Sequence, residues 1–168
     1  QTMLQHELVH LALGEWTREW TPAWLVEGAA VYYSGETMKE ALPMLDDAMR
    51  GGLSLRMLSS DSRLRPDNRD SLGLYLKYVF SAHVVEWIAR HHGEPKLLAL
   101  YTDFGREYPP EWGSGDALDY SDERGPAKTA SRLRLTELMI QNYLGRSLVQ
   151  MEAEVRQWLR SEIARSRR

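Results

Sequence analysis

Apolar residues recur every three or four positions along most of the chain, which is the spacing of one face of an α-helix. The clearest examples are Leu42, Leu45, Met49 and Leu53, then Leu74, Tyr78, Val85 and Ile88, and finally Leu148, Met151, Val155, Trp158 and Leu159. No segment alternates apolar and polar residues over enough positions to predict a β-strand. The sequence therefore predicts a mostly α fold, with helices over 2–13, 22–33, 37–50, 71–92, 94–104, 131–144 and 147–165.

The helical pattern is interrupted over residues 105–130, where prolines and glycines lie among many charged residues. This composition predicts a long loop. The loop is either a mobile surface insertion or a cap over a cleft, and the first is the more common role of such a segment. With 168 residues, 43% of them hydrophobic, the chain can form one core, so we expect a single domain over 1–168.

Composition excludes several functional classes. The net charge of −3 argues against non-specific binding to nucleic acid. No apolar run is long enough for a transmembrane helix. The absence of cysteine excludes disulfides and thiolate metal sites.

The segment His6-Glu7-Leu8-Val9-His10 indicates a metal site. Residues four apart in a helix lie on the same face, so His6 and His10 can both bind one ion. Glu7 lies beside that face, near enough to hydrogen-bond a water on the metal. Two ligands, an open position and a base are what a zinc hydrolase requires.

Glu27 is the expected third ligand. Its neighbours three and four positions away in the predicted helix 22–33 are Ala23, Trp24, Ala30 and Val31, and a carboxylate in such surroundings is costly unless it is paired or metal-bound. Thr21 is expected to cap this helix. If the chain folds back after a first helix ending near Gly14, then His6, His10, Glu27 and a water complete a four-coordinate catalytic site for one zinc ion.

These two segments resemble the gluzincin metallopeptidases, and in particular their compact bacterial branch, the peptidase MA-like family, a distant relative of the M1 aminopeptidases. The similarity rests on His-Glu-Leu-Val-His and on Pro-Ala-Trp-Leu-Val-Glu-Gly-Ala-Ala-Val-Tyr, which places the family's third ligand on Glu27. It continues, with less specific motifs, through Ala48–Leu53, Tyr78–Ser81, the helix to Gly93, Tyr143–Leu148 and a last helix reaching Trp158.

The resemblance implies zinc-dependent hydrolysis of a peptide or protein, with Tyr78 stabilising the oxyanion. Tyr75, one turn earlier, could take that role, and packing alone is the further alternative. His83, His91 and His92 fit structural roles better, as do Trp16 and Trp20. A different class of function, a peptidase-like binding or scaffolding domain, remains open.

The family's helical half follows a small β-sheet that supplies an edge strand for the substrate. We therefore expect this chain to be the helical C-terminal half of a thermolysin-like catalytic domain, with the N-terminal sheet subdomain of the same protein as its partner. An exopeptidase anchor, or a signal that sends the full-length protein out of the cytoplasm or to a membrane, would then lie upstream of Gln1.

Overall fold

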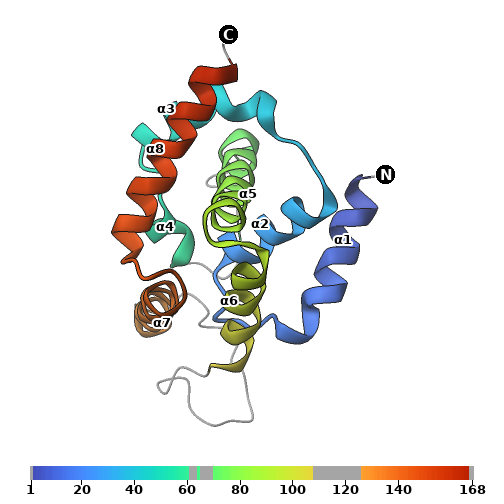
Figure 1. Ribbon diagram of the computed structural model, residues 1–168, viewed down its shortest axis with the longest axis vertical. Coiled ribbons are helices and arrows are strands. Elements are labelled where there is room, and N and C mark those ends of the chain that lie inside the picture. The colour runs from blue at the N-terminus through green and yellow to red at the C-terminus, as the bar shows by residue number, and fades with distance from the viewer. Residues whose placement is uncertain (1, 61–63, 65–69, 108–125, 167–168) are drawn as a thin grey trace.

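The computed structural model describes residues 2–60, 64, 70–107 and 126–166. Over these residues the protein is all-α, with eight α-helices, two short 3₁₀ helices and no β-strand, which confirms the predicted mostly α fold (Figure 1). The α-helices are α1 (Thr2–Leu13), α2 (Ala23–Ser34), α3 (Leu42–Arg50), α4 (Leu55–Ser59), α5 (Ser71–His92), α6 (Glu94–Arg106), α7 (Pro126–Leu144) and α8 (Leu148–Ser166); the 3₁₀ helices are η1 (Gly14–Trp16) and η2 (Lys39–Ala41).

The helix prediction was wrong in part over residues 37–60. The helix expected over 37–50 is divided into η2 and α3, because Pro43 lacks a backbone N–H and fits only the first turn of a helix. Helix α4 was not predicted. It is too short to show a period, and it begins where the Ser54 hydroxyl accepts a hydrogen bond from the backbone N–H of Met57 at 3.2 Å.

The loop expected over 105–130 falls mostly on 108–125, which lie outside the described residues. Both predicted bounds of this loop were wrong. Helix α6 continues through Gly105 to Arg106, and α7 begins at Pro126, five residues before the helix expected over 131–144. Proline is well suited to a first helical position, since its missing N–H would have no partner there.

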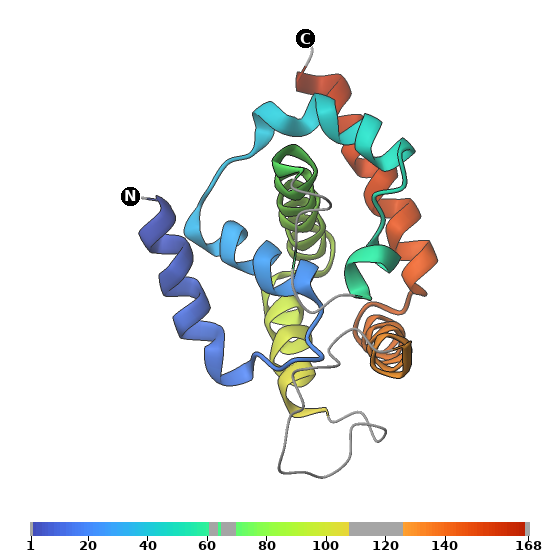
Figure 2. The same ribbon diagram turned by 180° about the vertical axis from the view of Figure 1, so that it is seen from behind.

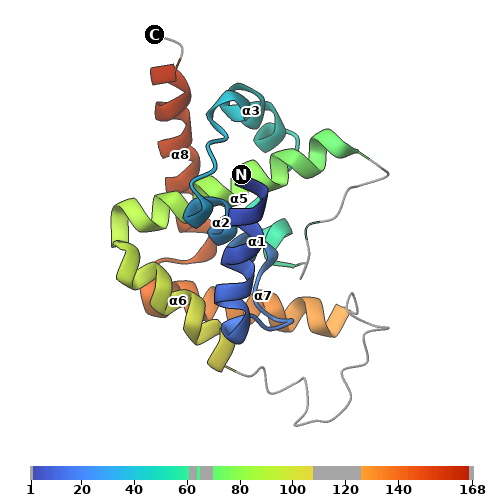
Figure 3. The same cartoon turned by 90° about the vertical axis from the view of Figure 1, so that its right-hand side faces the viewer.

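Helix α5 is the centre of the fold, with α2, α3, α6 and α8 packed against it (Figure 1, Figure 3). Its residues 79–85 are all buried, whereas a helix at the surface buries a single stripe. Helices α1 and α8 lie on opposite sides of α5 (Figure 2). None of the helices in the described parts of the chain combines the length and apolar composition needed to cross a membrane.

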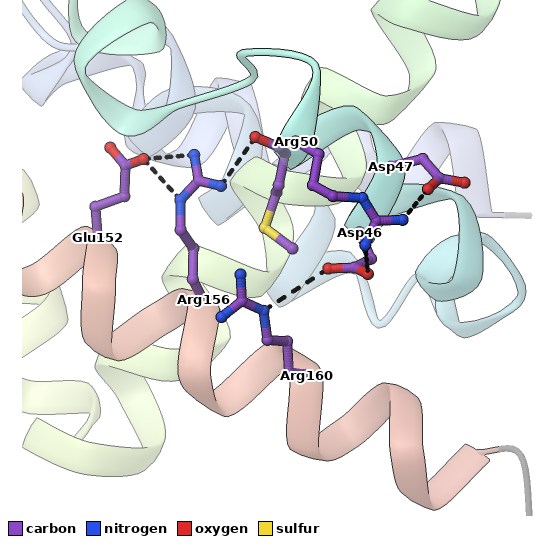
Figure 4. A network of polar contacts seen from close by, with 7 residues as sticks. Asp46, Asp47, Arg50, Glu152, Arg156 and Arg160 are labelled. Atoms are coloured by element: carbon purple, nitrogen blue, oxygen red, sulfur yellow. Dashed lines mark hydrogen bonds and ion pairs between the residues drawn. The ribbon is translucent and has the colours of Figure 1, made fainter.

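Helix α8 holds the segment between α3 and α4 through two partly buried charged residues, Glu152 and Arg156 (Figure 4). Arg156 donates to the carbonyl oxygens of Met49 at 3.1 Å and Leu53 at 2.6 Å, and to the carboxylate of Glu152 at 2.8 Å. Glu152 in turn accepts from the backbone N–H of Leu55 at 2.9 Å. These bonds satisfy backbone groups that the end of α3 and the start of α4 leave without helical partners. The same network includes Asp46, Asp47, Arg50 and Arg160 (Figure 4).

Candidate metal centre

Two histidines of α1 direct ring nitrogens toward one point. The Nε2 atoms of His6 and His10 are 3.0 Å apart, and the rings meet edge to face with centroids 4.8 Å apart. One helical turn separates the residues, so the backbone itself sets this approach. On the adjoining side of α1, Val9 and Leu13 pack against the core and fix the rotation of the helix.

The structure brings Glu27 of α2 to the same point. Its Oε2 atom lies 3.5 Å from Nε2 of His6 and 3.3 Å from Nε2 of His10. The side chains of His6, His10 and Glu27 retain 14%, 27% and 20% of their exposure, so the site is partly buried and partly open to solvent. Among the described residues, this is the one group of three or more side chains with ligand atoms spaced for a metal ion.

The three distances suit a tetrahedral zinc ion. With zinc–ligand bonds of about 2.0–2.1 Å, two ligand atoms of a tetrahedron are about 3.3 Å apart, and the observed separations are 3.0, 3.3 and 3.5 Å. Two imidazoles and one carboxylate with an open fourth position are a catalytic rather than a structural zinc donor set. The residues present therefore fit the metal that the sequence predicts.

The start of α2 differs from the prediction that Thr21 caps it. Pro22 is the N-cap residue, with extended backbone (φ −62°, ψ 138°) and no side-chain hydrogen bond. The Thr21 hydroxyl instead accepts from the backbone N–H of Arg18 at 3.0 Å and closes the preceding turn. That turn reverses the chain between α1 and α2, which is what allows Glu27 to return to the histidines.

Gly28 allows the close crossing of α2 over α5 next to Glu27. A Cβ atom at this position would lie 2.4 Å from the carbonyl oxygen of Ser81 and 2.7 Å from Cγ2 of Val85. Backbone atoms cannot yield as the end of a flexible side chain can, so any larger residue would push the two helices apart. Gly28 thereby lets α2 lie directly against α5. This close packing sets the position of the neighbouring Glu27 and places α5 beside the site.

Glu7 and Tyr78 lie close enough to the site to interact with its charges. Glu7 is exposed on α1, next to His6 in the chain. Tyr78 is half-buried on α5, one helical turn before Ser81. Burial, followed by the carboxylates of Glu27 and Glu7, raises the pKa of Tyr78 to about 12. The phenol therefore keeps its proton throughout the neutral range and can act as a hydrogen-bond donor.

Tyr75, the alternative to Tyr78, is directed elsewhere. Its hydroxyl donates to Oε1 of Glu40 at 3.4 Å. Burial and then Glu40 raise the pKa of Tyr75, and neither Glu7 nor Glu27 contributes to that shift. The electrostatic neighbourhood thus favours Tyr78 as the tyrosine of this site.

The surroundings of His10 make this side chain easier to protonate. Its hydrogen bond to Glu27 raises the pKa of His10 above the ordinary value, with the charges of Glu27 and Glu7 adding to the shift and partial burial opposing it. A proton on His10 is therefore a competitor for any cation bound here, and metal affinity should fall as the pH decreases.

Three of the other residues considered as functional candidates, His83, His91 and Trp20, have structural surroundings. His83 is buried and its Nδ1–H donates to the carbonyl of Val79 at 2.7 Å, while His91 donates to the carbonyl of Trp87 at 2.9 Å. Trp20 is buried, and its indole N–H donates to the carbonyl of Phe104 at 2.7 Å.

One carboxylate near the site was not singled out from the sequence. Oε1 of Glu36 lies 3.8 Å from Nδ1 of His6, the ring nitrogen turned away from Glu27. Thirty positions separate the two residues, and Glu36 belongs to no periodic helical pattern. No feature of the sequence could have paired them.

Comparison of the chain with protein-family models, with curated proteins and with solved structures gives no match in any of the three.

Proposed function

We propose that this protein is a zinc-dependent metallopeptidase. The observation that carries the proposal is the convergence of Nε2 of His6, Nε2 of His10 and Oε2 of Glu27 within 3.5 Å of one another. Two nitrogen donors and one carboxylate donor spaced this closely suit zinc, whereas magnesium and calcium prefer six or more oxygen ligands.

The chain's own residues account for the remaining chemistry. Bound zinc would supply a Lewis acid that brings the pKa of a coordinated water toward neutrality. Glu7, exposed on α1 and next to His6 in the chain, would act as the general base that takes a proton from the attacking water and as the general acid that returns it to the leaving amine. The phenolic hydroxyl of Tyr78 would donate a hydrogen bond to the substrate oxygen that gains negative charge.

The proposed architecture is the helical half of a gluzincin catalytic domain, with a β-sheet subdomain as its partner. The outer face of α1 supports this proposal, because Met3, Leu4, Leu8 and Leu11 are each more than half exposed. Beside them an apolar groove of about 660 Å³ is lined by Leu8, Val9, Ala12, Leu13, Tyr33, Glu94, Pro95 and Leu98. An apolar surface of this kind beside the site marks a place where another part of a protein packs.

Cleavage of an unstructured protein such as casein tests both proposals. The zinc-loaded chain should cleave casein slowly, and a chain that includes the proposed sheet subdomain should cleave it much faster. The reason is that an edge strand holds an extended substrate through main-chain hydrogen bonds, and positioning contributes several kcal/mol to lowering the barrier. Equal rates of casein cleavage would contradict the proposal that a β-sheet subdomain helps to hold the substrate. Zinc binding without cleavage by either chain would favour the binding or scaffolding domain.

The role of Tyr78 is open to a direct test. Tyr78→Phe should lower kcat by about 10²–10³-fold and leave KM nearly unchanged, since the lost hydrogen bond forms only as charge develops on the oxygen. Tyr75→Phe is the matched control and should have a mild effect, because its hydroxyl contacts Glu40. Steady-state kinetics on a peptide substrate measure both variants, and the reverse ranking would move the role to Tyr75.

A further inference from the structure

We propose that Glu36 is a positioning residue that orients the His6 ring for metal binding, an inference that rests on the proposed function. The two nitrogens of His6 face different partners. Nε2 faces His10 and Glu27 at 3.0 and 3.5 Å, while Nδ1 faces Oε1 of Glu36 at 3.8 Å. A histidine that binds a metal through one nitrogen commonly donates the N–H of the other to a carboxylate, which fixes both the tautomer and the ring orientation.

The direction of the contact determines which tautomer it stabilises. A carboxylate only accepts hydrogen bonds, so its position beside Nδ1 favours the hydrogen on that atom. Nε2 then keeps its lone pair, and Nε2 is the atom that points at His10 and Glu27. The 3.8 Å separation closes to a charge-assisted hydrogen bond if the Glu36 side chain moves by about 1 Å.

The backbone after α2 brings Glu36 to this place. Helix α2 ends at Ser34 and is capped by Gly35, whose φ of 73° lies in the left-handed region that glycine adopts most easily. The chain turns there, and the next residue faces the N-terminal half of α1. A single helix thus supplies the Glu27 carboxylate from its interior and, just beyond its end, the Glu36 carboxylate.

Glu36 is available for this role. Within residues 2–60, 64, 70–107 and 126–166, its one ion pair is with His6 and it forms no hydrogen bond. Its side chain is 20% exposed and lines a cavity of about 260 Å³ that also contacts Glu86 of α5. Glu86, by contrast, pairs with Arg90 at 2.8 Å. Glu86 therefore provides a matched carboxylate at the same cavity that does not contact His6.

The experiment compares zinc affinity in the wild-type chain, Glu36→Ala, Glu36→Gln and the control Glu86→Gln. Competition with a chromophoric chelator measures the dissociation constant, and circular dichroism checks that each variant is folded. Glu36→Ala should weaken zinc binding by about 10–100-fold, the usual effect of removing such a partner. Glu36→Gln should lie between wild type and Glu36→Ala, because its amide oxygen still accepts a hydrogen bond. Glu86→Gln should bind zinc as the wild type does.

Long-range ¹H–¹⁵N NMR of the zinc-loaded protein gives a readout that a merely structural role would not change. The Nδ1–H proton of His6 should be observed in the wild type and exchange rapidly with solvent in Glu36→Ala, while the ring signals of His10 remain as they were. Equal zinc affinity in wild type and Glu36→Ala, or an equal loss in Glu86→Gln, overturns the inference and leaves the proposed function standing. A wild-type chain that binds no zinc overturns the proposed function, and this inference with it.

Discussion

Replacement of Glu7 by glutamine should abolish nearly all turnover while leaving the zinc content at about one ion per chain. The amide cannot accept the proton of the attacking water, and loss of a general base costs about 10²–10⁴-fold in kcat. Glu7 is exposed on α1, so the substitution should leave the fold intact. Elemental analysis and the rate of peptide cleavage, measured on the same preparation, report the two properties separately.

Glu15→Gln is the control for this prediction. Glu15 is exposed in η1, immediately after α1, and the substitution removes the same charge from a position that contributes nothing to the donor set. The control should retain both zinc and activity. Undiminished turnover in Glu7→Gln would rule out Glu7 as the base, and loss of zinc in that variant would make it a ligand instead.

Removal of both histidines should abolish zinc binding. In the wild type, zinc at 100 times its dissociation constant should stabilise the folded state by about 2.7 kcal/mol, which for a chain of this size raises Tm by about 5–10 °C. The His6→Ala, His10→Ala double variant should show no such rise and no zinc by elemental analysis. His91→Ala, at the far end of α5, should behave as the wild type does.

Glu27→Gln completes this series. It replaces a charged ligand by a neutral one of the same shape, so it should weaken zinc binding without necessarily eliminating it. The contrast with Glu7→Gln is the informative result, because both changes remove one carboxylate near the same point. If the two variants retained the same amount of zinc, the division between ligand and base would be wrong. An undiminished zinc content in the double histidine variant would contradict the assignment of His6, His10 and Glu27 as the zinc ligands.

Several features of the fold follow from local sequence. Helix α1 and helix α5 have the predicted bounds, since apolar periodicity and helix-ending residues are properties of neighbouring positions. The juxtaposition of His6 and His10 is equally local, because one helical turn fixes it. Where the prediction was wrong, a proline restricts where a helix can begin, as at Pro43, or the element is too short to show a period, as in α4.

Other features could not be read from neighbouring positions. The sequence predicted Glu27 as the third ligand, from its apolar neighbours and from the gluzincin resemblance, but it could not give the position of Glu27 relative to the histidines. Its distance from the histidines depends on the turn before α2 and on the crossing of α2 over α5 at Gly28. The resemblance favoured Tyr78 over Tyr75, but which of the two is close to the site depends on which side of α5 faces it, and the sequence does not give that orientation.

The sequence by itself determined the helical class, the two histidines on one face of α1 and the candidate base between them, because a helix repeats every 3.6 residues. The tertiary structure alone decided that Glu27 meets those histidines at 3.3 and 3.5 Å, that Tyr78 lies near Glu7 and Glu27, and that Glu36 faces the other nitrogen of His6. These contacts join α1, α2 and α5, and helix packing is set by the fit of many side chains together. No pattern within a single segment can specify such a fit.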